Sequence, residues 1–413
     1  MSSALSIGLI GIGGMGGSHL SSLTELEAAG QVRLVAVAES AATKLGPKIE
    51  ELQARGVRWY AAYEQMLDNE KLDAVVVATP IFLHAEMARK CIERGVFVYL
   101  EKPPVPLIQQ LEELIELDRD ARVHLVFQMI SSEFIQQLKQ SVIEGKLGKI
   151  QDIRISACWP RHDSYYNRNN WAGKMALGDL PIFDGPATNG LAHLIHNAMF
   201  LAGESRQAFG ALEEVQAELY RVRPIESYDL ICLRGTFPSG IKLVAALTHA
   251  TQELHPFRLR ISGTKGWAEI SEDGHVMESC SGKQVCAEPH PEAWRNSYQN
   301  FIATANGQHS RPGTRLKDTR GYVKATNGAL LSSGEIFTVD KAYAREYGKN
   351  GDHGYDVPGL AELIDRSYHE GLLFSELGAP WAKATPIVQL QDLTSLDIRD
   401  FAGKITPCAT MKA

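Results

Sequence analysis

A glycine-rich turn near the start of the chain, GIGGMG from Gly11 to Gly16, limits the fold more than any other feature. An apolar segment, residues 5–10, precedes it and is typical of a buried strand. Residues 16–30 follow, with leucines at helical spacing and a terminal glycine. A second apolar segment, residues 32–38, ends at Glu39. This order of strand, glycine turn, helix and strand predicts a βαβ unit that binds a dinucleotide.

The glycines of this turn have separate expected roles. Gly11 permits a tight turn, Gly13 lets a pyrophosphate approach the backbone, and Gly16 lets the helix pack closely on the strand. The helix N-terminus adds N–H groups for the phosphates. Glu39 is expected to accept hydrogen bonds from a ribose and to repel a 2′-phosphate, so the sequence predicts NAD rather than NADP. A glycine-rich turn without a ligand is the alternative. The predicted cofactor contacts in the turn are Gly11, Ile12, Gly13, Gly14, Met15 and Gly16.

Apolar strands and helical segments continue to alternate up to about residue 128. Strands are predicted at residues 72–80, 96–103 and 123–128, and helices at 83–93 and 108–121. The alternation predicts an α/β fold with a doubly wound parallel sheet, whose cofactor contacts belong at the carboxyl ends of the strands. For His84, at the start of the first of these helices, the sequence leaves two roles open: a contact with the cofactor or a purely structural role. The predicted contacts are Thr79, Pro80, His84, Glu101, Lys102 and Gln128.

Composition and charge restrict the class of protein and its partners. The chain has 413 residues and a formal net charge of -7, which argues against a broad basic surface for nucleic acid. It contains no apolar run of about 18 residues, so no membrane span is predicted. The cysteines lack a metal-type spacing, and we expect mostly buried, reduced thiols in a cytoplasmic protein without a bound metal: Cys91, Cys158, Cys232, Cys280, Cys286 and Cys408.

Three further segments, together with the glycine turn, resemble the Gfo/Idh/MocA oxidoreductases, the family of glucose-fructose oxidoreductase and inositol dehydrogenase. They are ATPIFLHAEMARKCIERGVFVYLEKP (residues 78–103), IEGKLGKI (143–150) and NGLAHLIHNAMFLAG (189–203). The resemblance implies an NAD-binding Rossmann domain over residues 1–130. It also implies a second α/β domain over residues 131–413, whose large, open, mostly antiparallel sheet binds substrate and makes subunit contacts. A homo-oligomer, either a dimer or a tetramer, is therefore expected.

The resemblance also implies the catalytic residues. The lysine of the EKP motif, here Lys102, exchanges a proton with the substrate hydroxyl; a surface lysine paired with the neighbouring glutamate is the alternative. His193 matches the family's histidine, and Asn189 stands where the family has an aspartate. Four residues apart on one helix, these two would point at one substrate. Asp184 is expected either to cap this helix, with Pro186 in the first turn, or to take over the carboxylate role.

A polar and aromatic segment, residues 158–179, follows a predicted strand at residues 150–159. Flat rings that stack on a sugar, beside guanidinium and amide groups that bind its hydroxyls, suit carbohydrate recognition. A loop that covers a core or an interface is the alternative. The predicted substrate contacts in this segment are Arg161, Tyr166, Arg168 and Lys174.

We therefore expect an NAD-dependent oxidoreductase that transfers a hydride between nicotinamide and a ring hydroxyl carbon of a sugar, sugar derivative or polyol. Lys102 would act as acid and base, and His193 and Asn189 would orient the substrate. Two alternatives stay open. One is a glycosidase that uses NAD to oxidise its substrate transiently, without net NADH. The other is a non-catalytic regulatory protein that senses NAD(H).

Overall fold

The computed structural model describes residues 4–272, 274–279, 282–286, 292–308 and 313–402. The chain forms two compact units. Unit 1 comprises Met1–Val105, Gln110–Ser132 and Glu292–Thr319, and unit 2 comprises Pro106–Gln109, Glu133–Pro291 and Arg320–Ala413. Of the predicted thiols, Cys91, Cys158 and Cys232 are buried and free. Cys280 and Cys408 lie outside the described residues, as does the side chain of Cys286.

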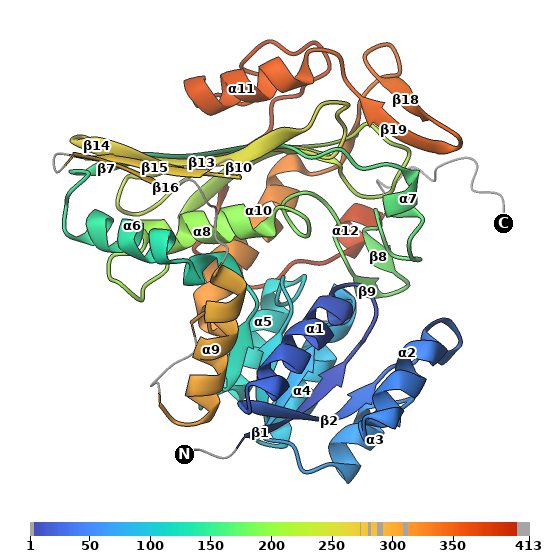
Figure 1. Cartoon of the computed structure of the whole chain (residues 1–413). Coiled ribbons are helices and arrows are strands. Elements are labelled where there is room, and N and C mark those ends of the chain that lie inside the picture. The colour runs from blue at the N-terminus through green and yellow to red at the C-terminus, as the bar shows by residue number, and fades with distance from the viewer. Residues whose placement is uncertain (1–3, 273, 280–281, 287–291, 309–312, 403–413) are drawn as a thin grey trace. The chain divides into compact units, whose positions relative to one another are not determined.

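Unit 1 contains a sheet of six parallel strands in the order β3-β2-β1-β4-β5-β6, which confirms the doubly wound fold (Figure 1). The strand order reverses beside β1, the point at which such sheets bind dinucleotides. The strands are β1 Leu5–Ile10, β2 Val32–Ala38, β3 Arg58–Tyr60, β4 Ala74–Val77, β5 Phe97–Leu100 and β6 Val123–Leu125. The helices are α1 Met15–Ala28, α2 Ala42–Ala54, α3 Tyr63–Asn69, α4 His84–Glu93, α5 Ile108–Leu117 and α9 Ala293–Ala305.

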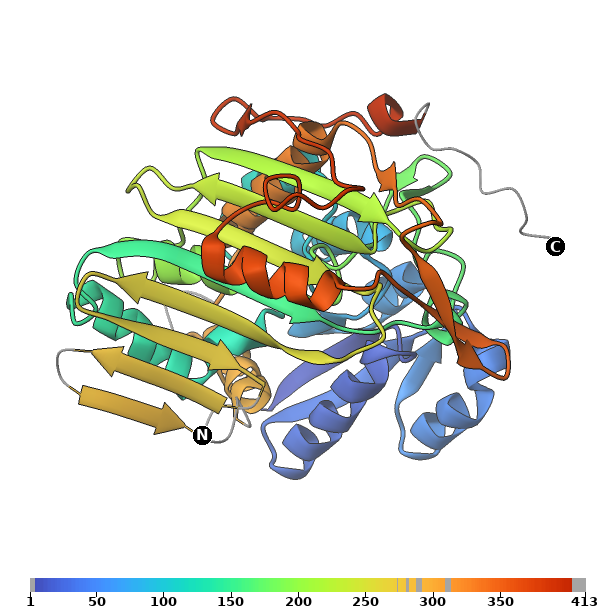
Figure 2. The same cartoon turned by 90° about the horizontal axis from the view of Figure 1, so that it is seen from above.

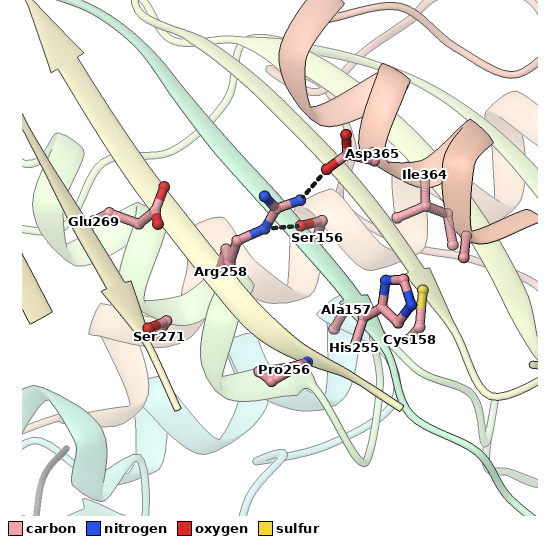
Figure 3. A pocket seen from close by; sticks show the side chains of 11 residues that line it. Ser156, Ala157, Cys158, His255, Pro256, Arg258, Glu269, Ser271, Ile364 and Asp365 are labelled. Carbon is pink, nitrogen blue, oxygen red and sulfur yellow. Dashed lines mark hydrogen bonds and ion pairs between the residues drawn. The ribbon is translucent and has the colours of Figure 1, made fainter. Parts of the chain in front are cut away.

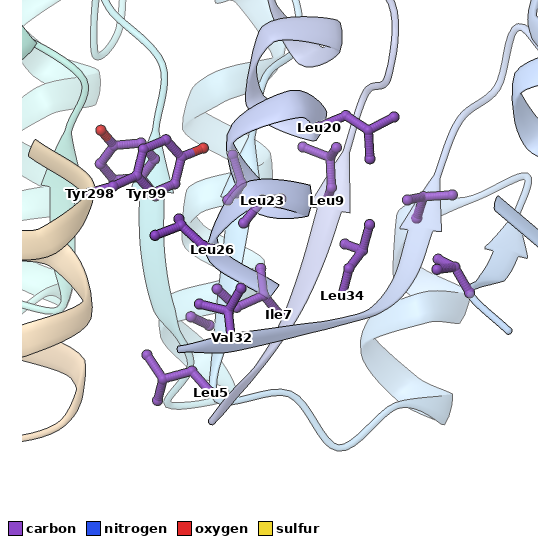
Figure 4. Packing of buried hydrophobic residues seen from close by; sticks show 14 of the residues in the cluster. Leu5, Ile7, Leu9, Leu20, Leu23, Leu26, Val32, Leu34, Tyr99 and Tyr298 are labelled. Atoms are coloured by element: carbon purple, nitrogen blue, oxygen red, sulfur yellow. The ribbon is translucent and has the colours of Figure 1, made fainter. Parts of the chain in front are cut away.

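The core of unit 1 lies between this sheet and its helices (Figure 4). Leu9 of β1, Leu23 of α1 and Leu34 of β2 are buried, as the apolar spacing of their segments predicts. On β5, Tyr99 packs against Tyr298 of α9, with ring centroids 4.5 Å apart. Helix α9, which comes from the later part of the chain, thereby contributes to the core of unit 1.

Unit 2 contains a ten-stranded sheet in the order β16-β15-β14-β13-β7-β12-β11-β10-β17, with β20 paired to β10. Only the β7–β12 and β10–β17 pairs of this sheet are parallel, so the expected large, mostly antiparallel sheet is confirmed. The strands are β7 Ile150–Cys158, β10 Glu214–Arg221, β11 Leu230–Thr236, β12 Lys242–Thr248, β13 His255–Gly263, β14 Gly266–Ser271, β15 Gly274–Ser279, β16 Gly282–Cys286, β17 Phe337–Thr338 and β20 Val388–Gln389.

Helices cover both faces of this sheet. Helices α6 (Glu133–Ile143), α8 (Ala192–Ala202) and α10 (Arg320–Ser333) lie on one face, and α11 (Leu360–Glu370) lies across the other (Figures 1 and 2). Beneath α11, apolar side chains of the sheet and of the C-terminal segment form a second core that includes Tyr220, Ile364 and Phe374. A hairpin, β18 (Arg345–Lys349) and β19 (Asp352–Asp356), belongs to the same segment. The C-terminal segment therefore covers the central strands β7 and β12.

One lysine is fully buried where α6 meets α8. Nζ of Lys139 donates to the carbonyl oxygens of Phe200 at 2.5 Å, Gly203 at 2.6 Å and Ala208 at 3.2 Å. Phe200 lies in the last turn of α8 and Gly203 directly follows the helix. The last carbonyls of a helix lack partners within it and attract a cation. Lys139 therefore holds the C-terminal end of α8 in place.

Candidate functional site

The glycine turn between β1 and α1 depends on two of its glycines. Gly11 has a φ of 84°, and a β carbon there would lie 2.5 Å from the carbonyl oxygen of Ala78. A β carbon on Gly16 would clash with the carbonyl oxygen of Gly11. These two positions therefore exclude larger residues, because the turn is tight and α1 begins directly against it.

The outer side of the same turn has room for a ligand. A β carbon on Gly14 would meet no atom within 4 Å, and one on Gly13 would contact only Leu45, at 3.5 Å. Nζ of Lys48 donates to the carbonyl oxygen of Ile12 at 3.2 Å, which adds a positive charge beside the turn. An open turn at a helix N-terminus, with a cation nearby, fits a pyrophosphate.

Glu39 is bound to the turn by its carboxylate. Its Oε2 accepts a hydrogen bond from the N–H of Ile12 at 3.0 Å, and its Oε1 accepts one from the N–H of Ala41 at 2.8 Å. Trp59 donates from its indole to the Glu39 carbonyl oxygen at 3.2 Å. The negative charge that the sequence places after β2 is thus held beside the glycine turn.

His84 joins two loops at the carboxyl ends of neighbouring strands. Its Nε2 lies 2.9 Å from the carbonyl oxygen of Thr79, after β4, and its Nδ1 lies 2.9 Å from that of Pro103, after β5. The side chain is buried, and burial lowers its pKa. These contacts give His84 a structural role; its contact with the cofactor stays a prediction.

Glu101 is buried and is held by a histidine of α1. Its Oε1 lies 2.9 Å from Nε2 of His19, whose Nδ1 lies 2.5 Å from the hydroxyl of Tyr298. Oε2 accepts the backbone N–H of Lys102 at 2.9 Å. Burial opposes ionisation of Glu101, but the hydrogen bond and charge of His19 outweigh it, and its pKa is lowered. Glu101 is therefore part of an internal network and not the exposed half of a surface ion pair.

Lys102 is half-buried and directly follows this network at the carboxyl end of β5. The peptide bond between Lys102 and Pro103 is cis. Gln128 begins a short 3-10 helix after β6, Gln128–Ser131, and its Oε1 is buried without a hydrogen-bond partner among the described residues. An amide oxygen of this kind fits a cofactor that carries donors. The described carboxyl ends of β1, β2, β4, β5 and β6 thus all carry predicted cofactor residues.

In unit 2, the expected helix start is wrong. Helix α8 begins at Ala192, so Pro186 is not in its first turn and Asp184 is not its N-cap. Oδ2 of Asp184 instead accepts the N–H of Gly173 at 2.7 Å, and its Oδ1 accepts the side-chain amide of Asn189 at 2.7 Å. Asn189 lies in the turns before α8, and the half-buried His193 lies at its start, so the two do not share a helix face.

The late start of α8 has a local cause. The hydroxyl of Thr188 donates to the Phe183 carbonyl oxygen, and Asn189 is committed to Asp184. Such side-chain bonds compete with helical ones. A β carbon on Gly185 would lie 2.5 Å from the ring of Tyr228, so this turn also packs tightly against the residues that precede β11.

The aromatic segment after β7 contains stacked arginines. The guanidinium carbon of Arg161 lies 4.5 Å from the ring centre of Trp159 and 4.8 Å from that of Tyr165. The guanidinium carbon of Arg168 lies 3.6 Å from the centre of the same Tyr165 ring, and the Arg168 side chain is exposed. Lys174 is half-buried in the same segment. Arginines on aromatic rings agree with the expected chemistry of this segment, while substrate contact stays a prediction.

Tyr166 has a different environment from the other predicted substrate contacts of this segment. Its ring lies 4.7 Å from the guanidinium carbon of Arg223, which forms an ion pair with Asp163. Asp163 also accepts the N–H of His353 at 3.1 Å, so the hairpin β18–β19 supports this segment. Burial raises the pKa of Tyr166. These contacts give Tyr166 a packing role.

One residue of this region was absent from the sequence predictions. His249, just after β12, is 3% exposed, and its ring centroid lies 6.1 Å from that of Tyr165. The N–H of Arg161 donates to the His249 carbonyl oxygen at 3.1 Å. A lone histidine at a strand end carries no signal of such a position, because its neighbours come from a distant part of the chain.

Two pockets of the described residues lie elsewhere, and both are lined in part by α11 or by the residues that directly follow it. One, of about 300 Å³, is crossed by an ion pair between Arg258 and Asp365 at 2.6 Å, and Arg258 also donates to Ser156 (Figure 3). The other, of about 810 Å³, lies over the starts of β7 and β12. Neither pocket is lined by a predicted site residue.

In the described ranges of the chain, no three His, Cys, Asp or Glu side chains gather where they could bind a metal ion. Within the same ranges, every helix is too short or too polar to cross a membrane.

Two family models match the chain. The model of the oxidoreductase family with an NAD-binding Rossmann fold, GFO_IDH_MocA, matches residues 5–128. The model of the GFO/IDH/MocA C-terminal domain matches residues 135–269. The match to the first model identifies unit 1 as an NAD-binding domain.

Curated relatives agree with this assignment at low identity. An uncharacterized oxidoreductase from Synechocystis sp. is 25% identical over 223 residues, 52% of this chain and 58% of that protein. Levoglucosan dehydrogenase from Pseudarthrobacter phenanthrenivorans is 27% identical over 186 residues, 43% of this chain and 44% of the enzyme. The chain thus spans about half the length of these two relatives. An inositol 2-dehydrogenase/D-chiro-inositol 3-dehydrogenase from Lacticaseibacillus casei is 25% identical over 337 residues, 79% of this chain and 91% of that enzyme.

Solved structures share the fold. The WlbA dehydrogenase from Bordetella pertussis, in complex with NADH and UDP-GlcNAcA, is 22% identical with a TM-score of 0.67, over 80% of this chain and 96% of that one. A levoglucosan dehydrogenase in complex with NADH is 18% identical with a TM-score of 0.69, over 80% of this chain and 97% of that one. With both family models matched in order along the sequence, the chain belongs to the GFO/IDH/MocA family of oxidoreductases.

Proposed function

We propose that the chain is an NAD-dependent dehydrogenase that acts on a ring hydroxyl carbon of a sugar, sugar derivative or polyol. The observation that carries this proposal is the carboxyl edge of the unit 1 sheet. There Glu39 is bound to the glycine turn, and the half-buried Lys102 follows the network around Glu101. Relatives named as levoglucosan and inositol dehydrogenases support the substrate class.

Residues of unit 1 would hold NAD, which supplies the hydride acceptor when bound. The N–H groups at the glycine turn would bind the pyrophosphate, and Glu39 would accept hydrogen bonds from a ribose. Thr79 and Pro80, after β4, and Gln128, after β6, would complete the contacts. In this role Glu101 acts indirectly, because its carboxylate fixes the backbone of Lys102.

We assign the transfer of the substrate hydroxyl proton to Lys102. As an amine, its Nζ would take the proton of the substrate hydroxyl during oxidation, and as an ammonium it would return the proton during reduction. In unit 2, His193 and Asn189 would bind substrate hydroxyls. Asp184 accepts the Asn189 amide and thereby sets the orientation of that side chain, so we assign it a positioning role.

The test is the absorbance at 340 nm of the purified protein with NAD⁺ or NADP⁺ and a panel of sugars, sugar acids, polyols and glycosides. We expect steady NADH formation with at least one free sugar, sugar acid or polyol. Cleavage of glycosides without net NADH would contradict the proposal and indicate transient oxidation instead. Tight NADH binding without any turnover would also contradict it and indicate a regulatory protein.

Replacing Glu39 with glutamine is expected to lower the preference for NAD⁺ over NADP⁺ at least about tenfold. The amide keeps an oxygen for the turn but lacks the charge that repels a 2′-phosphate. The measurement is the ratio of kcat/KM for the two cofactors. Glu51→Gln, the same change at an exposed position of α2, is the control. An unchanged ratio in Glu39→Gln would show that the carboxylate does not set the preference.

A further inference from the structure

Arg161 differs from many arginines of unit 2 in lacking a carboxylate partner. Within the described residues, its guanidinium forms no ion pair, and its Nε is buried without a hydrogen-bond partner. Arg168, Arg206 and Arg260 of the unit also lack an ion pair among the described residues, but of these four arginines only Arg161 has a buried nitrogen without a hydrogen-bond partner. Other arginines of the unit are paired: Arg154 with Asp152, Arg223 with Asp163, Arg234 with Glu376, Arg258 with Asp365, Arg345 with Asp356 and Arg366 with Glu370.

The side chains around Arg161 leave its N–H groups as the part of the guanidinium that can bind a ligand. The rings of Trp159 and Tyr165 lie within cation–π distance of the guanidinium. They attract its charge and keep water from that part of the group. A cation that is partly removed from water is costly unless an anion compensates it. The planar fork of N–H donors on a guanidinium matches the two oxygens of a carboxylate.

His249, beside Arg161, presents an acceptor of defined orientation. Its Nδ1 lies 3.0 Å from the carbonyl oxygen of Trp159, which can only accept, so Nδ1 carries the proton of the neutral ring. Burial, together with the charges of Arg161 and Arg168, lowers the His249 pKa to about 3. Nε2 therefore has a lone pair, and it meets no hydrogen-bond partner among the described residues.

Gly190 packs against this nitrogen, and any larger residue at position 190 would press on it. A β carbon on Gly190 would lie 3.0 Å from Nε2 of His249 and 3.8 Å from the ring of Trp159. Gly190 directly follows Asn189 and lies shortly before His193 in the chain. The unpartnered nitrogen is thus next to the segment of unit 2 to which we assign substrate binding.

We propose that Arg161 and His249 form a subsite for a sugar acid. Arg161 binds the carboxylate of the substrate through its N–H groups, and Nε2 of His249 accepts a hydrogen bond from a hydroxyl of the same molecule. The two partners are not interchangeable, because a carboxylate oxygen at Nε2 would meet a second lone pair. This inference rests on the proposed function and narrows its substrate class to uronates.

The first test is calorimetric binding to the full-length protein in the presence of NAD⁺. The ligands are D-glucuronate and D-galacturonate, with D-glucose, D-galactose and D-glucose 6-phosphate for comparison. We expect at least one sugar acid to bind more tightly than its neutral counterpart and than the phosphate. Arg161→Gln is expected to weaken that acid about 10- to 100-fold, with little effect on the neutral sugars. Arg366→Gln removes the same charge from the half-exposed pair on α11 and should change neither.

A second variant tests the hydroxyl acceptor without changing charge. Gly190→Ala places a methyl group against Nε2 and should weaken binding of the acid about tenfold, while the melting temperature reports whether the variant is folded. Equal losses of acid and neutral sugar in Arg161→Gln, or tighter binding of the phosphate, would overturn the proposal. Arg161-dependent binding without NADH formation would leave the subsite standing and refute the dehydrogenase. NADH formation from neutral sugars alone would support the dehydrogenase and refute the subsite.

Discussion

Replacing Lys102 with methionine is expected to lower kcat for the oxidised substrate by roughly 10²- to 10⁴-fold, the usual contribution of a general acid or base. Methionine keeps an unbranched side chain of similar length but cannot exchange a proton. The backbone N–H of residue 102 still donates to Glu101, so the network with His19 should survive. The measurement is kcat from NADH formation, beside the dissociation constant of NADH from fluorescence.

Two comparisons make this result specific to proton transfer. Lys71→Met, at an exposed position before β4, should leave kcat unchanged. NADH binding by Lys102→Met should stay within about threefold of the unaltered protein, because the proposed phosphate contacts lie after β1 and not after β5. A fall in NADH affinity as large as the fall in kcat would show that Lys102 binds the cofactor instead. An unchanged kcat would contradict the acid–base assignment outright.

The elements that the sequence predicted in unit 1 each have a local cause. The apolar run before Gly11, the leucines of α1 and the position of Glu39 all act within a few tens of residues. The glycines at positions 11 and 16 are required by backbone contacts inside that same βαβ unit. Local pattern and final structure therefore agree, as expected where a motif closes on itself.

The site in unit 2 was less predictable because its contacts are long-range. Nδ1 of His249 bonds to Trp159, which is 90 residues away along the chain. The start of α8 was mispredicted for a different, local reason: Thr188 and Asn189 bond to residues 183 and 184, where the helical pattern alone favoured an earlier start. The sequence thus predicted which segments contain the polar groups, but it did not predict which of those groups remain unpaired.

Replacing Lys139 with methionine is expected to lower the free energy of unfolding by about 3 kcal/mol. The variant keeps the apolar stem but removes the Nζ donor from the carbonyl oxygens of Phe200, Gly203 and Ala208, of which that of Phe200 still accepts the N–H of Gly203 at 3.2 Å. Buried carbonyls at a helix end without a partner are a main source of large destabilisation. The measurement is urea unfolding followed by circular dichroism. Lys146→Met, at an exposed ion pair just after α6, should change stability by less than about 0.5 kcal/mol.

The pH dependence of this difference tests the charge of the buried lysine. Burial lowers the Lys139 pKa to about 7, whereas an unfolded lysine titrates near 10.4. Between these values the unfolded chain binds more protons than the folded one, so the stability that Lys139 contributes rises with pH. The difference between the unaltered protein and Lys139→Met should therefore grow from pH 7 to pH 10. A difference that stays constant would mean that the three carbonyl oxygens keep the ammonium charged.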